Sequence, residues 1–329
     1  MRAGRKTVMG KLKFAIYWGA ACGGCDVAVV DTHEKLLDIA AAADILFWPV
    51  AMDFKYHDVE EMADKNIDVC LFSGAVRNSE NEHIAKLLRA KSKVMVAFGA
   101  CAQLGGIPGL ANEKRRQDIL DFVYHGSPST VSQKGIYPQE ITSVPEGKLK
   151  LPKFYDAVMA LDQAVEVDYY VPGCPPEPAR ILEVINAIVT GNLPPKGAVV
   201  GALDKALCDS CPRKREEKRV KAFYRPHEIL FDPERCFLEQ GLICLGPATR
   251  GGCSDPPRCI RSNMPCRGCY GPPPDITDQG AKMLSAVGSI IDSQDPEEIE
   301  KIIDGIADPL GTFYRFGLPA SALRKKRFS

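Results

Sequence analysis

The sequence predicts an α/β protein in which a doubly wound parallel sheet is followed by a loop-rich domain with short helices. Three observations lead to this prediction. Apolar runs alternate with helical patterns up to about residue 190, which is typical of parallel βαβ units. Periodicity then weakens after a Pro/Gly-rich stretch. Eight of the 13 cysteines follow that stretch, and we expect this part to lack a large apolar core of its own.

The first part is expected to contain five strands and three helices. The strands are predicted at 14–18, 44–48, 67–72, 94–98 and 165–171, and the helices at 27–43, 79–90 and 178–190. Residues 192–197, Asn-Leu-Pro-Pro-Lys-Gly, are typical of a linker. We therefore divide the chain into an α/β domain at 1–191 and a second domain at 192–329. In the second domain, a capping-box pattern at 295–298 predicts a short helix to about residue 306.

Charge and hydropathy argue against several classes of function. The 42 Lys and Arg residues balance 42 Asp and Glu residues, so the composition gives no support to a nucleic-acid or anionic membrane partner. A basic stretch at 213–221 is typical of a solvated face or a docking surface. No apolar run approaches the ~20 residues of a membrane helix, and the first, at 14–18, is too short for a signal-peptide core. We therefore expect a cytoplasmic protein without a membrane span, in which cysteines bind metals rather than form disulfides.

Four cysteines follow three of the predicted strands. Cys22 and Cys25 follow the first strand, Cys101 the fourth and Cys174 the fifth. Because the carboxyl ends of parallel strands meet at one edge of the sheet, these thiols are expected to converge on one rim. Neighbouring glycines would let backbone N–H groups approach a metal cluster there. The alternative is a thioredoxin-type dithiol at Cys22 and Cys25 with two unrelated buried thiols, which leaves the positions of Cys101 and Cys174 unexplained.

The other cysteines form a C-terminal set of eight and one isolated residue. The eight are Cys208, Cys211, Cys236, Cys244, Cys253, Cys259, Cys266 and Cys269. Their number fits two four-thiolate sites, which could be zinc sites or iron–sulfur clusters. A rim cluster in the same chain favours iron–sulfur, because a series of clusters conducts electrons and zinc does not. Cys70 lies inside the third predicted strand, where we expect a small buried side chain.

Three short motifs and the C-terminal cysteine spacing occur together in one known family. The motifs are the C-x-x-C after the first strand, Gly99-Ala100-Cys101 with Gly105-Gly106 close behind, and Pro172-Gly173-Cys174-Pro175-Pro176. The combination resembles the small, electron-transfer subunit of [NiFe] hydrogenases over nearly the whole chain. Residues 18–26, 47–50 and 77–80 are most similar to the cytoplasmic methyl-viologen-reducing type, the hydrogenase partner of heterodisulfide reductase.

The resemblance implies a flavodoxin-like first domain, an iron–sulfur second domain and three [4Fe–4S] clusters. The implied ligands are Cys22, Cys25, Cys101 and Cys174 for the proximal cluster, Cys208, Cys211, Cys236 and Cys244 for the distal cluster, and Cys253, Cys259, Cys266 and Cys269 for the medial cluster. The implied partners are a large subunit that carries the Ni–Fe site, a small iron–sulfur electron carrier and heterodisulfide reductase. This chain would then contain no catalytic residue of its own.

Three positions differ from other members of the family. Cys208 stands where the exported uptake enzymes commonly have His, and Cys259 stands where they commonly have Pro. The medial site should therefore hold four irons rather than three. Ser73 stands where many members have an acidic residue, which argues against a proton-transfer role at this position.

Two alternative functions remain at this point. The related cluster-bearing subunit of respiratory complex I shares the α/β fold, but it has adjacent cysteines at its first site and lacks a C-terminal eight-cysteine domain. A zinc-stabilised scaffold or nucleic-acid module is disfavoured by the zero net charge and by the strand-end thiols. The sequence therefore predicts the electron-transfer subunit of a cytoplasmic [NiFe] hydrogenase.

Overall fold

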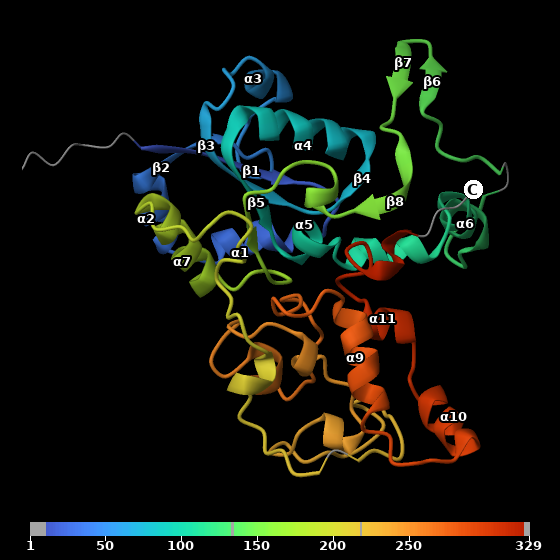
Figure 1. Ribbon diagram of the computed structural model, residues 1–329. Coiled ribbons are helices and arrows are strands. Elements are labelled where there is room, and N and C mark those ends of the chain that lie inside the picture. The colour runs from blue at the N-terminus through green and yellow to red at the C-terminus, as the bar shows by residue number, and fades with distance from the viewer. Residues whose placement is uncertain (1–10, 133–134, 218, 326–329) are drawn as a thin grey trace, which may run out of the picture.

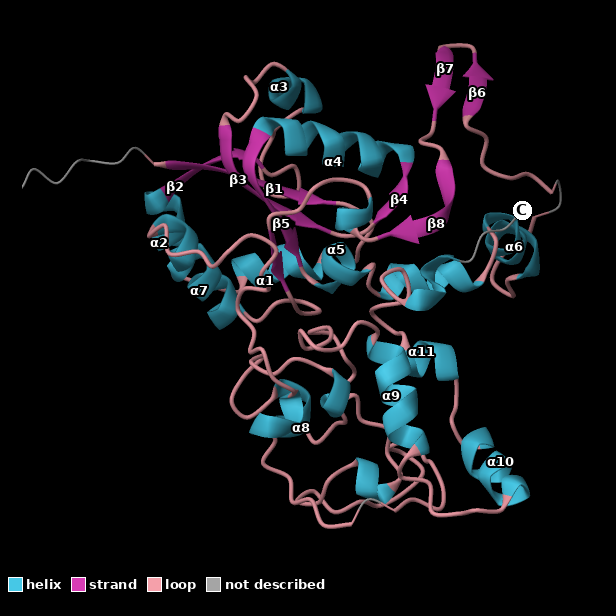
Figure 2. Cartoon of the chain, in the orientation of Figure 1, coloured by secondary structure: helices cyan, strands magenta, loops and turns pink. Residues whose placement is uncertain are grey.

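The computed structural model describes residues 11–132, 135–217 and 219–325. The first part of the chain forms a sheet with helices on both sides, and the part after about residue 200 forms a separate layer below it (Figure 1). Strands lie in the first part, whereas short helices and long loops make up the second (Figure 2). Within the described ranges, no helix combines the length and the apolar character needed to cross a membrane.

Five parallel strands form the central sheet. They are β1 (Leu12–Trp18), β2 (Ala43–Phe47), β3 (Ile67–Ser73), β5 (Ser92–Phe98) and β9 (Tyr169–Val171). Their order across the sheet is β2-β1-β3-β5-β9, which is the flavodoxin-like order of a doubly wound sheet. Every neighbouring pair is parallel, so the carboxyl ends of all five strands lie at one edge. The predicted fold class is confirmed.

Helices cover both faces of this sheet. α1 (Gly24–Val30), α2 (Lys35–Ala42) and α7 (Pro178–Val189) cover one face, and α3 (Tyr56–Glu60) and α4 (Ser79–Lys91) cover the other. Phe14 and Ile16 of β1 belong to a core that includes Ile185 of α7. Ala15, between them, belongs to the opposite core with Leu88 of α4. Because successive strand residues point to opposite faces, β1 is buried on both sides, as a parallel sheet requires.

The helix predicted at 27–43 is in fact two helices, α1 and α2, with a turn between them. In this turn, Thr32 Oγ1 donates to the Val29 oxygen at 2.7 Å, and His33 has a left-handed φ of 53°. Short polar side chains compete for backbone hydrogen bonds in this way, so the helix stops although the apolar pattern continues. The strand predicted at 165–171 is also shorter, because only Tyr169–Val171 pairs with β5.

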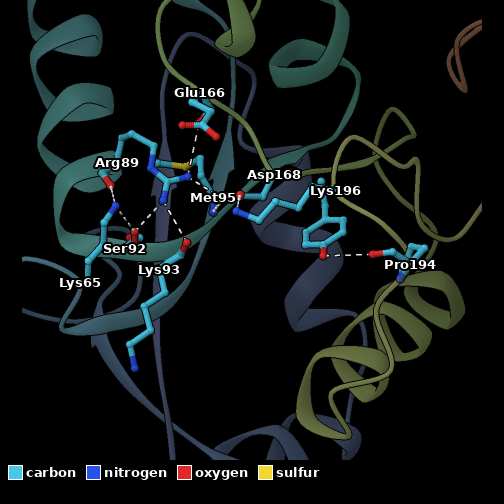
Figure 3. A network of polar contacts seen from close by, with 10 residues as sticks. Lys65, Arg89, Ser92, Lys93, Met95, Glu166, Asp168, Pro194 and Lys196 are labelled. Atoms are coloured by element: carbon cyan, nitrogen blue, oxygen red, sulfur yellow. Dashed lines mark hydrogen bonds and ion pairs between the residues drawn. The ribbon is translucent and has the colours of Figure 1, made fainter.

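A buried carboxylate fixes the start of β9 (Figure 3). Asp168 is 1 % exposed; its Oδ2 accepts a hydrogen bond from Arg89 Nη1 at 2.6 Å and another from the Met95 N–H at 2.8 Å. Its Oδ1 lies 2.5 Å from Lys196 Nζ. Although burial acts to raise the pKa of Asp168, these three partners lower it below its ordinary value. The network joins α4, β5 and the linker at 192–197 to β9.

Between β5 and β9 the chain leaves the sheet. α6 (Arg116–Asp121) is followed by the hairpin of β6 (Ile141–Val144) and β7 (Gly147–Lys150), and β8 (Phe154–Met159) then pairs antiparallel with β4 (Val76–Asn78). The hairpin projects away from the sheet (Figure 1). These strands were not predicted from the sequence, because β6 and β7 are short and exposed and carry no clear alternation of buried and polar residues.

The second part has a larger apolar core than we expected. Buried residues from Leu207 to Leu318 form one cluster that includes Phe237 and Met283. Its helices are α8 (Arg258–Arg261), α9 (Gln279–Gly288), α10 (Pro296–Asp304) and α11 (Pro309–Phe313). α10 matches the helix predicted from residue 295, and Asp295 caps it by accepting the Glu297 N–H at 3.0 Å. The expectation of no large core was wrong, because irregular loops supply apolar side chains without a detectable period.

Short helical turns complete the chain. They are α5 (Ala100–Leu104), Ile107–Glu113, Phe122–Gly126, Leu161–Gln163, Leu207–Ser210, Leu238–Gln240, Gly246–Ala248 and Ala322–Lys325. The segment at 316–320 returns from the second part to α5. There Phe316 packs against Leu104, the Gly106 N–H donates to the Phe316 oxygen at 2.9 Å, and Pro319 fills the space beside Gly105. The second part therefore supports the helix that follows β5.

Candidate metal centres

The carboxyl edge of the sheet gathers the four cysteines that follow strands, here called the rim cysteines. Cys22 lies just before α1 and Cys25 in its first turn, Cys101 lies in α5, and Cys174 lies in the loop after β9. Burial raises the pKa of the Cys25 thiol above its ordinary value, and the nearby Cys101, Cys174 and Cys22 raise it further. The structure thus brings together the four thiols that strand-end spacing placed on one rim.

The rim site is open on one side. Cys25 and Cys101 are buried, and burial raises the pKa of Cys101 to about 12, whereas Cys22 and Cys174 are exposed. Two apolar side chains with exposed fractions of 39 % and 51 %, Trp18 and Ile107, lie at this side. The Trp18 ring packs beside the turn between Cys22 and Cys25, and the Ile107 N–H donates to the Cys101 sulfur. Apolar side chains therefore form part of the surface beside the rim cysteines.

Two glycines keep space clear beside the rim thiols. Gly99 has a φ of 86° and Gly106 a φ of 59°, in the region that glycine adopts without steric cost. A Cβ atom at Gly99 would overlap the sulfur of Cys25, and one at Gly106 would overlap the sulfur of Cys101. The rim cysteines consequently line a cradle that side chains at these positions would fill.

Asp26 is a buried carboxylate behind the rim site that sequence analysis did not single out. Its Oδ1 accepts a hydrogen bond from Trp48 Nε1 at 2.9 Å, and its Oδ2 lies 3.2 Å from Ser73 Oγ. The Ser73 hydroxyl also lies 3.2 Å from the Tyr17 carbonyl oxygen. These contacts fix α1 against the ends of β1, β2 and β3. A carboxylate directly after a C-x-x-C motif is the signal that could have revealed this role.

Four cysteines of the second part surround a small cavity of about 20 Å³; we call Cys208, Cys211, Cys236 and Cys244 the outer cysteines. Burial raises the pKa of Cys208 to about 12, and the other three thiols of the group contribute. Burial also raises the pKa of Cys244 to about 11. A Cβ atom at Gly246 would stand 3.1 Å from the Cys208 sulfur, so this site also has a glycine at close approach.

The remaining four, the middle cysteines, line a cavity of about 250 Å³; they are Cys253, Cys259, Cys266 and Cys269. Burial raises the pKa of Cys269 to about 12, with further contributions from neighbouring thiols, and it raises the pKa of Cys266 well above its ordinary value. Cys174 of the rim cysteines lines the same cavity. The rim and middle groups are therefore direct neighbours.

The outer group adjoins the middle group on its other side. The backbone N–H of Cys266, a middle cysteine, donates to the sulfur of Cys244, an outer cysteine, at 3.2 Å. This contact and the position of Cys174 in the middle cavity show that the three groups lie in the order rim, middle, outer. The loop-rich part thus extends the row of thiols away from the sheet.

The rim and middle thiol groups fit a polynuclear cluster better than a single ion. In the described residues, no set of three or more His, Cys, Asp or Glu is arranged to hold one metal ion. Zinc draws its four ligands to about 2.3 Å from one atom. The middle cysteines instead enclose a cavity, and glycines hold open the rim site. All-thiolate donors around such space are those used by iron–sulfur clusters.

Cys70 lies apart from these groups. It is fully buried in β3 and packs in the core with Met95 and Leu88, as the sequence predicted for a small buried side chain. Burial raises the pKa of its thiol to about 12. Its position inside a strand, rather than after one, explains why it does not reach the rim.

Two arginines near the cysteines were not recognised as site residues from the sequence. Arg213 is buried beside the outer cysteines, so it does not form part of the solvated face predicted for 213–221. Arg267 is half-buried; burial and the nearby Arg315 lower the pKa of its guanidinium, whereas three neighbouring thiols act to raise it. Arg213 lies two residues after Cys211, and Arg267 directly follows Cys266. A basic residue this close to a C-x-x-C cysteine is the pattern that could have marked them.

Residues 22–188 match the model of a family described as NADH ubiquinone oxidoreductase, 20 Kd subunit. Over 323 residues, the chain is 43% identical to the iron–sulfur subunit of the F420-non-reducing hydrogenase of Archaeoglobus profundus, and the match covers 96% of this chain and 99% of that protein. It is 37% identical over 324 residues to a subunit of the F420-non-reducing hydrogenase of Methanothermobacter marburgensis, with 96% and 97% covered.

A chain in a solved structure of an NAD⁺-reducing [NiFe]-hydrogenase in the H2-reduced state is also similar. The TM-score is 0.48 and the sequence identity is 29%, over 55% of this chain and 92% of that chain.

Proposed function

Because the chain belongs to the family of F420-non-reducing hydrogenase small subunits, we propose that it is the electron-transfer subunit of a cytoplasmic [NiFe] hydrogenase. It would pass electrons from dihydrogen oxidation in a large subunit to a downstream carrier. The row of three four-cysteine groups carries this proposal. The match to the NADH ubiquinone oxidoreductase subunit ends at residue 188, before the outer and middle cysteines, whereas the hydrogenase relatives extend over them. This difference favours the hydrogenase over the complex I alternative.

The rim cysteines would hold the proximal [4Fe–4S] cluster, the middle cysteines the medial cluster and the outer cysteines the distal cluster. A cluster bound in this way takes up and passes on one electron at a time. The chain supplies the thiolates, shields part of each group from water and sets the distances between the sites. Since burial raises the pKa of Cys101, Cys208 and Cys269 to about 12, these thiols are protonated near neutral pH in the metal-free chain, and cluster binding must displace their protons.

The order of the three groups supports one direction of electron flow. The rim cysteines lie at the opening marked by Trp18 and Ile107, and exposed apolar side chains of this kind are typical of a surface that another protein covers. We therefore place the large subunit, with its Ni–Fe site, against the rim. The outer cysteines would then mark the exit, where a small iron–sulfur carrier and heterodisulfide reductase receive the electrons.

The division into an α/β domain at 1–191 and an iron–sulfur domain at 192–329 is part of this proposal. It is supported by the end of α7 at Val189 and by the absence of another helix before Leu207 in this fully described stretch. The contact of residues 316–320 with α5 then forms the bridge between the two domains.

Metal analysis of the anaerobically purified native protein tests the proposed function. We expect about twelve irons and about twelve acid-labile sulfides per chain, because three four-thiolate groups each fit one [4Fe–4S] cluster, together with a copurifying nickel-containing subunit. Stoichiometric zinc would contradict the iron–sulfur assignment. A cluster-replete monomer of 35.9 kDa without a nickel subunit would contradict the hydrogenase assignment.

A further inference from the structure

Arg213 is a buried cation beside the outer cysteines. It is 6 % exposed and lines the same cavity as Cys208, Cys211 and Cys244. Its neighbour Arg215 lines this cavity too, but Arg215 is exposed. Because Coulomb interactions are screened least where water is excluded, solvent screens the charge of the buried Arg213 less than that of the exposed Arg215.

The guanidinium of Arg213 is held in one orientation by four contacts. Nη1 donates to the carbonyl oxygens of Asp232 at 3.2 Å and Arg235 at 2.8 Å, and Nη2 donates to Asn263 Oδ1. The carbon Cζ stacks 3.7 Å from the centre of the Phe237 ring. A planar group fixed in this way cannot turn its remaining donors toward another acceptor.

One of the two remaining donors, Nε–H, is buried and has no acceptor among the described residues. Leaving a buried donor unpaired is unfavourable, and more so for a charged group, so a native site normally supplies an acceptor. Apart from Arg213 and Arg215, the side chains that line this cavity are the four outer cysteines and apolar residues. The groups that could accept from Nε are therefore those of the outer site.

We propose that Arg213 donates a hydrogen bond from Nε to the distal cluster or its thiolates and raises the reduction potential of this cluster. The inference rests on the proposed presence of a cluster at the outer cysteines. One-electron reduction adds one negative charge at the site, and a buried cation with a directed N–H stabilises that charge. Arg213 is thus not a ligand, and it makes the last site of the row a better electron acceptor.

An EPR-monitored redox titration of the cluster-replete native complex tests this role. We compare Arg213→Gln, which removes the charge, with Arg213→Lys, which keeps a charge but lacks Nε–H. Arg215→Gln is the matched control, since it removes an exposed charge from the same cavity. The signal of the distal cluster is identified as the one altered in Cys208→Ser.

For Arg213→Gln we expect at least a tenfold fall in the ratio of reduced to oxidised distal cluster at a fixed potential, which equals 59 mV for a one-electron couple. Arg213→Lys should show a smaller fall, and Arg215→Gln less than a twofold change. A change below twofold in Arg213→Gln, or an equal change in Arg215→Gln, would overturn the proposal. Wild-type iron content that shows no cluster at the outer site would instead refute the proposed function.

A second measurement detects the hydrogen bond in the wild type, and Arg213→Lys assigns the signal to Arg213. Wild-type complex labelled with ¹⁵N in the arginine guanidinium should show a ¹⁵N coupling in the ENDOR spectrum of the reduced distal cluster, and this coupling should be absent in Arg213→Lys. If labelled wild type shows no such coupling, Nε does not bond to the cluster and the inference fails, whatever the iron content of Arg213→Gln.

Discussion

Cys70 illustrates how position along a strand decides the role of a thiol. It lies within β3, fully buried among apolar side chains. We expect Cys70→Ala to leave the iron content unchanged and to lower the free energy of unfolding by about 1 kcal/mol, since one buried atom the size of a methylene is lost. Iron analysis and urea unfolding check these outcomes. A loss of about four irons would make Cys70 a ligand.

Gly99 is the glycine on which the rim cradle most depends. Its φ is 86°, and a Cβ atom there would overlap the Cys25 sulfur. We expect Gly99→Ala to lose the rim cluster, seen as a fall of about four irons per chain. Gly191→Ala is the control, because Gly191 has a φ of 69° but open space around it. Equal iron loss in both variants would attribute the effect to backbone strain alone.

The strand ends could be predicted from the sequence, and the polar anchors between elements could not. Cys22, Cys101 and Cys174 follow apolar runs with clear periodicity, so their convergence follows from parallel strand topology alone. The burial of Arg213 depends on carbonyl oxygens about 20 residues away and on the ring of Phe237. Such long-range contacts leave no period in the sequence, and a basic stretch therefore looks solvated.

Asp168 anchors β9 to α4 and β5 by polar contacts between residues that are far apart in the sequence. We expect Asp168→Asn to destabilise the protein by about 3 kcal/mol, because it leaves the largely buried Arg89 without its counter-charge. Urea unfolding gives the value. Asp38→Asn is the control, since its ion pair with Lys35 is exposed and contributes at most about 1 kcal/mol.

The same ion pair predicts a pH dependence. The pKa of Asp168 is lowered in the folded chain, so its stabilisation is present above the unfolded pKa of about 3.9 and is lost as pH falls through the folded value. Wild type should therefore lose more stability on acidification below about pH 4 than Asp168→Asn. Parallel pH profiles for the two proteins would contradict this role of Asp168.

At the scale of the whole molecule, the order of the three thiol groups predicts which variants lose dihydrogen oxidation and which lose only electron transfer to the acceptor. Cys101→Ser should abolish dihydrogen oxidation with every acceptor, because the rim site is the first in the row. Cys208→Ser should leave proton–deuterium exchange at the Ni–Fe site near wild type and should slow only acceptor reduction. Isotope exchange followed by mass spectrometry, beside dye reduction, checks both. Loss of exchange in Cys208→Ser with the large subunit still bound would reverse the assigned order.

The return of residues 316–320 to α5 has a consequence for the folding route. Contacts such as that of Pro319 with Gly105 join positions more than two hundred residues apart, and closing so long a loop is entropically costly and kinetically late. We therefore expect the helix that carries Cys101 to acquire its final protection against hydrogen exchange only after the loop-rich part has folded. The order of folding would then be the reverse of the proposed order of electron transfer, because the site proposed to receive electrons first would be completed last.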